Sequence, residues 1–231
     1  MGAIKSATVM TNMPYSEQAL KYAALHSQEY SFGLHFNIAE GRPHLRIREN
    51  SLTGPDGLFA SAYRQRINLL LGRFSPEHVA GEMELQLAIM TDYGVKISHV
   101  DSHGHMHKFP SVFRAILPAL KKFGINQVRR PQNLFINRST QFSILNSYCA
   151  RAFKGVNCTE DFAGIKVDFT KTWWHDLADR LQSENLELGI HPGLEEGWRR
   201  YEAEPFLDGR FATILAERGF ENCSYWDLDF A

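Results

Sequence analysis

Three histidines crowd into the segment DSHGHMH, residues 101–107, directly after a short apolar run. In an extended chain every second side chain projects to the same side, so Asp101, His103, His105 and His107 are expected to converge on one site. Neutral imidazoles bind Zn, Ni, Co or Fe(II), and carboxylates admit Mg or Mn. The alternative is a polar loop whose histidines cap helices or bind carbonyl groups. The spacing favours a metal or acid–base role without fixing the metal.

Two further histidines end strand-like runs. His35 lies in GLHFNIAEGRP, residues 33–43, where it alternates with Leu34 and Phe36 and so points opposite to them. His191 ends the apolar run of LELGIHPG, and a Pro-Gly turn follows it. A histidine there can act as an acid or a base near neutrality, because its ordinary pKa is about 6.5. A buried structural histidine explains the first motif equally well. A turn that merely ends the strand explains the second equally well.

Cationic and aromatic residues near these motifs suggest substrate contacts. In VRRP, Arg129 or Arg130 can hold a carboxylate or orient a ligand aspartate, although surface charge is the plainer explanation. The aromatic side chains that could stack on a sugar are Tyr63, Trp173, Trp174 and Trp198. Packing explains most of them, and the polar surroundings of Trp198 make it the preferred sugar-stacking residue.

The elements that position these residues follow a regular alternation. Short apolar runs alternate with segments of helical spacing, which predicts a parallel α/β arrangement in a single domain over residues 1–231. The predicted strands are 7–11, 31–38, 97–101, 127–129 and 187–191, and the predicted helices are 16–26, 76–93, 111–123, 170–184 and 208–218. Ser75 and Pro76 form a helix start, and the polar segment 41–59 is predicted to be a long loop on the functional face.

The composition excludes several classes of partner. With 25 Lys and Arg against 26 Asp and Glu, the net charge of −1 creates no field that would attract nucleic acid. The chain shows no signal peptide and no apolar run long enough for a membrane span. Three widely spaced cysteines fit neither a disulfide framework nor a metal knuckle. A cytoplasmic protein with reduced thiols is expected.

Taken in order, GLHFNIAEGRP, SLTGPDGLF, HVDSHGHMHKFP, VRRP, DFAG and ELGIHPG resemble the motif series of the YdjC-like carbohydrate deacetylases, which include chitooligosaccharide deacetylases. The resemblance implies a TIM-barrel-like, somewhat irregular α/β fold. It also implies hydrolysis of the acetamide of N-acetylglucosamine-containing sugars with one divalent metal ion, Mg or Zn. By this resemblance His35 and His103 are the metal ligands. From their own positions, His105, His107, Arg129 and Trp198 are expected to hold substrate or to orient the ligands.

One part of the family pattern is not found. Family members open with a strand ending in a DDFG-like motif that supplies a further ligand and a base, and this chain is expected to lack that first strand and helix. Asp101 is then the nominated base and His191 the acid for the departing amine. Unpaired strand edges would favour a homodimer. The alternatives are a catalytically inactive sugar-binding or partner-binding homologue, and a metal-dependent hydrolase of another substrate class.

Overall fold

The computed structural model describes residues 4–135, 140–164, 173–193 and 195–230 of the chain. Parallel strands alternate with helices along these residues, so the predicted mixed α/β class is confirmed. No helix within these ranges is long and apolar enough to cross a membrane.

Three parallel strands form the main sheet, in the order β1 (Ser6–Val9), β2 (Ser31–Phe36) and β3 (Ile97–Ser102). The register between β2 and β3 pairs His35 with Asp101. Because all three strands run in the same direction, their carboxyl ends meet at one edge of the sheet. That edge carries the candidate site.

Helices alternate with the strands along the described residues. They are α1 (Ser16–His26), α2 (Ala62–Leu70), α3 (Pro76–Asp92), α4 (Pro110–Lys122), α5 (Thr140–Ala150), α6 (Trp173–Ala178), α7 (Gly197–Leu207) and α8 (Arg210–Glu217), with a 3₁₀ segment, η1, over His103–Lys108. The start of α3 is as predicted: Ser75 Oγ accepts a hydrogen bond from the backbone N–H of His78 at 3.2 Å, and Pro76 follows the cap. Gly94, with a φ of 81°, follows the end of the helix.

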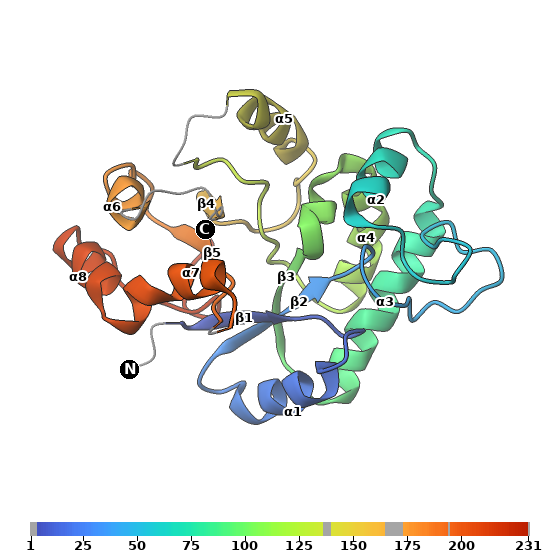
Figure 1. Cartoon of the computed structure of the whole chain (residues 1–231), viewed down its shortest axis with the longest axis horizontal. Coiled ribbons are helices and arrows are strands. Elements are labelled where there is room, and N and C mark those ends of the chain that lie inside the picture. Colours follow the sequence, from blue (N-terminus) through green and yellow to red (C-terminus); the bar gives the residue numbers. More distant parts are fainter. Residues whose placement is uncertain (1–3, 136–139, 165–172, 194, 231) are drawn as a thin grey trace.

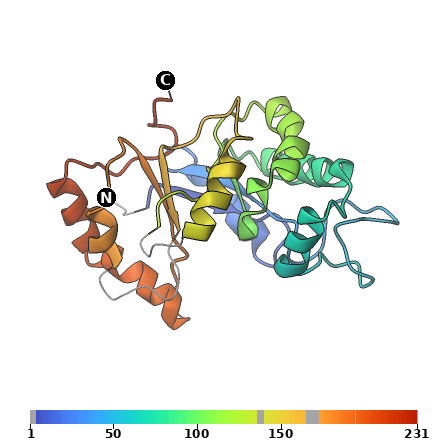
Figure 2. The same cartoon turned by 90° about the horizontal axis from the view of Figure 1, so that it is seen from above.

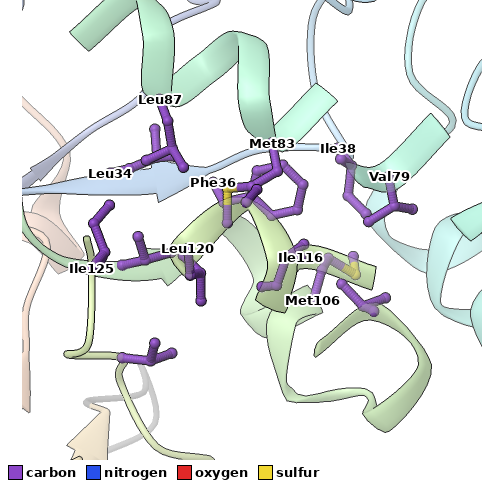
Figure 3. Packing of buried hydrophobic residues seen from close by; sticks show 14 of the residues in the cluster. Leu34, Phe36, Ile38, Val79, Met83, Leu87, Met106, Ile116, Leu120 and Ile125 are labelled. Carbon is purple, nitrogen blue, oxygen red and sulfur yellow. The ribbon is translucent and has the colours of Figure 1, made fainter. Parts of the chain in front are cut away.

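The main core lies between the sheet and the helices α3 and α4 (Figure 3). Leu34 and Phe36 of β2 are fully buried against Met83 and Leu87 of α3 and Ile116 of α4. These side chains recur at helical spacing on α3 and α4 and at every second position on β2, so each element presents one apolar face to the others.

A second, smaller sheet pairs β4 (Asp161–Gly164) with β5 (Leu186–Gly189) in parallel. Together with α6, α7 and α8 it lies at the opposite end of the long axis from α2, α3 and α4 (Figures 1 and 2). Trp173, Trp174 and Phe211 are at the centre of its own apolar cluster.

The described strands do not close into a barrel. The predicted strand 127–129 makes only isolated bridges, from Val128 to Val100 and from Gln127 to Asn157, so the two sheets remain separate. The outer edges of β1 and β5 pair with no other described strand. The TIM-barrel-like architecture is therefore not confirmed, although the parallel order that it requires is present.

Candidate active site

His35 lies near the carboxyl end of β2, between the two residues that anchor that strand in the core. Leu34 and Phe36 are fully buried, whereas the His35 side chain keeps 19% of its surface exposed. Alternation along the strand therefore places His35 on the face away from the helical core, as its sequence neighbours predict.

Asp101 lies directly beside His35 on β3. The distance from His35 Nδ1 to Asp101 Oδ1 is 2.7 Å, and Thr8 Oγ1 on β1 is 3.3 Å from the same nitrogen. A carboxylate only accepts hydrogen bonds, so His35 carries its proton on Nδ1 and keeps the Nε2 lone pair for a ligand. Burial would raise the pKa of Asp101, but Arg129 and His35 hold it far below the usual range.

The histidines after β3 do not continue the predicted extended conformation. The strand ends at Ser102, and the chain turns through η1, where Gly104 and His105 have left-handed φ values of 61° and 56°. Arg66 on α2 donates to the carbonyl oxygen of Gly104 at 3.1 Å. The predicted extended conformation is therefore wrong after Ser102, and each of the three histidines has different surroundings.

His103 is the histidine that the turn brings against His35. The two ring centroids are 5.7 Å apart, with the rings inclined at 70°. His103 Nε2 lies 3.2 Å from Oε2 of Glu40, whose side chain is 54% exposed. Burial lowers the pKa of His103, and the neighbouring His35 lowers it further. The neutral ring, which is the form that binds metals, is thereby favoured.

His105 and His107 lie behind these two residues. His105 packs edge-on against Phe162, at 5.8 Å between ring centroids. His107 is 1% exposed, and both its ring nitrogens are engaged, with Ser102 Oγ at 2.5 Å and the carbonyl oxygen of Arg129 at 2.8 Å. Burial lowers its pKa to about 4. His107 therefore fixes the turn and the Arg129 backbone, and has no ring nitrogen left for substrate.

Arg129 joins the two sheets beneath the histidines. It forms an ion pair with Asp101, and its Nε lies 2.6 Å from Oε1 of Glu187 on β5. Its guanidinium is 4.8 Å from the Phe162 ring centroid. Of the two arginines in VRRP, Arg129 thus holds the aspartate, whereas Arg130 donates to backbone carbonyls.

His191 and Trp198 form the rim on the side of β5. Glu202 Oε2 accepts a hydrogen bond from the His191 backbone N–H at 2.6 Å and lies 3.3 Å from its Nδ1, while 56% of the His191 side chain is exposed. Burial is the main cause of the lowered pKa of His103, and the electrostatic effect of His191 is the last of its contributions. Trp198 lies 5.7 Å from His191, and the Arg199 guanidinium is 4.6 Å from the Trp198 ring.

The residues present fit a divalent metal at His35 and His103. The free Nε2 of His35, backed by a carboxylate at Nδ1, is the arrangement found in metal-ligating histidines. Within the described ranges, no set of three or more His, Cys, Asp or Glu residues has metal-binding geometry. The imidazoles of His35 and His103 are therefore the two protein donors that the described residues bring together.

An apolar hollow of about 370 Å³ lies elsewhere, between β1, α1 and α7. Phe32, Ile190 and Phe206 are among the residues that line it, and none of the histidines discussed here does so. Its lining is mostly apolar, with hydroxyl groups only on Ser6, Tyr22 and Tyr30. The histidine cluster is therefore the better candidate for the active site.

Three residues of the site were not predicted from the sequence. Glu40 lies within a motif that was selected for its histidine alone. Glu187 and Tyr225 meet at the far end of the Arg129 network, where the Tyr225 hydroxyl donates to Glu187 Oε2 at 2.5 Å. A carboxylate inside an otherwise apolar strand is a signal for Glu187, whereas no local signal singles out Tyr225.

Parallel strands whose carboxyl ends gather histidines and carboxylates define an α/β protein of the enzyme type, since ligands and catalytic groups of such folds collect there. The chain belongs to the YdjC-like protein family, whose model matches residues 1–217. This confirms the resemblance seen in the ordered motifs.

Its relatives include proteins named carbohydrate deacetylase. The human one is 33% identical over 271 residues, covering 99% of this chain and 83% of the relative. The mouse one is 34% identical, covering 99% of this chain and 87% of the relative. A solved structure from Enterococcus faecalis is described as a cellobiose-phosphate cleavage protein. The match covers 97% of this chain and 88% of the solved chain. Its TM-score is 0.77 at 19% identity, which supports the fold alone.

Proposed function

We propose that this chain is a metal-dependent hydrolase that removes the acetyl group from N-acetylglucosamine-containing sugars. The observation that carries the proposal is the pairing of His35 and His103, with the Nε2 lone pair of His35 left available by Asp101. Membership of a family whose relatives are named carbohydrate deacetylases supports the acetylated-sugar substrate.

One divalent ion, Mg or Zn, is the proposed cofactor, with His35 and His103 as its ligands. Such an ion polarises a carbonyl group and lowers the pKa of bound water. Both histidines offer imidazole nitrogens, and the carboxylate behind His35 increases the basicity of its ring. Zn is favoured by the imidazoles, and Mg by any oxygen ligands that complete the site.

The structure favours a positioning role for Asp101 over the catalytic base predicted from the sequence. Its side chain is 0% exposed, and it holds both His35 and Arg129, so no substrate water can approach its oxygens. Glu40 instead presents an exposed carboxylate beside His103. We therefore assign to Glu40 the removal of a proton from the attacking water.

His191 is proposed to protonate the departing amine. Its exposed ring stands at the rim, and Glu202 holds both its backbone N–H and its Nδ1. That contact leaves Nε2 to deliver the proton. Trp198 beside it offers an aromatic surface at the same rim for the sugar, and Arg199 stacks on that ring.

The test is acetate release from N,N'-diacetylchitobiose and from N-acetylglucosamine, with chelated protein and with Zn, Mg, Mn or Co added back. His35→Ala and His103→Ala should lose bound metal and activity together. His191→Ala should keep the metal and lower kcat by about 100-fold, the lower range for a lost acid–base group. His26→Ala, on the exposed end of α1, is the matched control and should behave as wild type.

Other results would redirect the assignment. Equal metal loss in the His191 and His103 variants would contradict their separate roles. Sugar binding without acetate release would indicate an inactive sugar-binding homologue. Metal-dependent turnover of a phosphate ester or another amide, but of neither sugar, would indicate a different substrate class.

A further inference from the structure

A continuous line of buried polar contacts runs from His35 to the C-terminal segment. Asp101 binds the His35 ring, Arg129 pairs with Asp101 and with Glu187, and Tyr225 donates its hydroxyl to Glu187. The line starts on β2 and passes through β3 and β5. It ends at Tyr225, which follows His35 by 190 positions in the sequence.

The pair of Arg129 with Asp101 depends on the contacts that Glu187 makes at the other end of this line. Asp101 and Glu187 share the single guanidinium of Arg129, and the exposed fractions of Arg129 and Glu187 are only 13% and 9%. Buried charges require partners because the protein interior solvates them poorly. The Tyr225 hydroxyl gives Glu187 a second donor. Fixed by this second donor, Glu187 holds the Arg129 guanidinium in the position from which it pairs with Asp101.

Tyr225 is itself held in place by contacts other than its hydroxyl. Its ring stacks on His99 with 3.7 Å between centroids and an 8° inclination. Its backbone N–H donates to Ser31 Oγ at 3.1 Å, and Gln127 Nε2 donates to its carbonyl oxygen at 3.3 Å. The hydroxyl is therefore delivered to Glu187 from a fixed position, and removing it alone leaves the other anchors intact.

We propose that Glu187 and Tyr225 are positioning residues of the active site, which act through Arg129 and Asp101 to fix the orientation and tautomer of His35. This inference rests on the proposed function in so far as it treats His35 as a ligand. Without Tyr225 or Glu187, Asp101 holds the His35 ring less tightly, and the ring samples the tautomer with its proton on Nε2. That tautomer presents no lone pair to a metal.

The test follows the His35 tautomer in the metal-free protein by nitrogen-15 NMR of the histidine rings, with His35→Gln used to assign the signal. Wild type should show a single tautomer, protonated on Nδ1. Tyr225→Phe and Glu187→Gln should both raise the fraction protonated on Nε2. Ile116→Val, which trims the core between α3 and α4, is the control for a general loss of stability and should leave the His35 signal unchanged.

Cobalt binding supplies a second readout. Tyr225→Phe should weaken Co²⁺ affinity by about 3- to 10-fold, somewhat less than the ~10–100-fold typical of a residue in direct contact with a metal ligand. Because Asp101 is the link to the ring, Tyr225→Phe should produce no further loss in an Asp101→Asn background.

The outcomes separate the two proposals. A wild-type His35 tautomer in both Tyr225→Phe and Glu187→Gln overturns the positioning roles, whether or not metal binds. Wild-type protein that binds no Co²⁺, or that binds it equally well after His35→Ala, overturns the proposed metal site, while the NMR experiment still decides the positioning roles.

Discussion

Burial keeps His99, His105 and His107 neutral by lowering the pKa of each ring. Burial lowers the pKa of His107 to about 4 and that of His99 to about 3. A histidine in the unfolded chain has a pKa of about 6.5. As the pH falls from about 6.5 towards 4, the unfolded chain therefore binds protons that the folded protein does not bind. The stability due to these groups is fully present above about pH 6.5 and is lost below it.

We expect wild-type protein to have a lower urea midpoint at pH 5 than at pH 7 for this reason. His107→Gln should be less stable at pH 7, because it loses contacts with Ser102 and the Arg129 carbonyl. It should nevertheless lose less stability between pH 7 and pH 5. Urea titrations at both values check this, with the partly exposed His26→Gln as control. An identical pH-dependent loss in His107→Gln and wild type would contradict the explanation.

The sequence predicts where the site residues lie better than it predicts which residues they contact. His35 points as strand alternation predicts, but it lies beside Asp101 only because the register between β2 and β3 shifts between Phe32 and Leu34, which no local pattern predicts. His105 and His107 depart from the prediction because a left-handed turn at Gly104 and His105 interrupts the strand period. The link from Arg129 to Tyr225 joins residues far apart in the chain, which no local pattern reveals.

Helix α3 has a polar stripe inside the core, and this stripe holds the chain after β2. Gln86 is fully buried, donates from Nε2 to the Asn37 carbonyl at 2.7 Å and accepts from the Asn37 backbone N–H at 3.0 Å. Glu82, also buried, accepts from the backbone N–H groups of His44 and Leu45. These side chains form hydrogen bonds with backbone groups in the segment that follows β2 and carries Glu40.

Gln86→Leu should therefore destabilise the protein by about 2–4 kcal/mol, because it leaves two backbone groups of Asn37 buried without partners. Glu84→Gln, on the exposed side of the same helix, removes only a surface ion pair with Lys122 and should cost about 0–1 kcal/mol. Equilibrium unfolding in urea measures both. Equal costs for the two variants would mean that the buried stripe does not stabilise the fold.

At the element level, four helices are predicted within two residues at either end: α1, α3, α4 and α8. The helices α2, α5 and α7 were missed, and so was strand β4. Short elements such as β4 depend on pairing with a partner strand, here β5, and carry little signal of their own. The predicted helix 170–184 starts outside the described residues; of its described part, 173–184, only α6 is helical, so its predicted end is six residues too late.

The molecule has two apolar clusters of unequal size, and all four tryptophans follow residue 172 in the sequence. Trp173 and Trp174 lie in the smaller cluster. Tryptophan fluorescence therefore reports mainly on the part built around β4 and β5, whereas amide exchange in α3 and α4 reports on the larger core.

We expect the fluorescence transition in urea to have a lower midpoint than the loss of exchange protection in α3 and α4, because the smaller cluster buries less apolar surface. Trp226, which lies at Lys96 on the main sheet, can be replaced by Phe to make the fluorescence signal specific. Coincident midpoints in the Trp226→Phe protein would instead show that the two clusters unfold as one unit.

The hydrogen bond from Tyr225 to Ser31 spans 194 positions of the chain. Closing so long a loop is entropically costly, whereas β1, β2 and β3 join through much shorter connections. During refolding, the helical signal should therefore recover well before acetate release does. The orientation of His35 would then be among the last features that a newly formed molecule acquires. A partly folded chain would therefore have its sheet and helices in place and still be inactive.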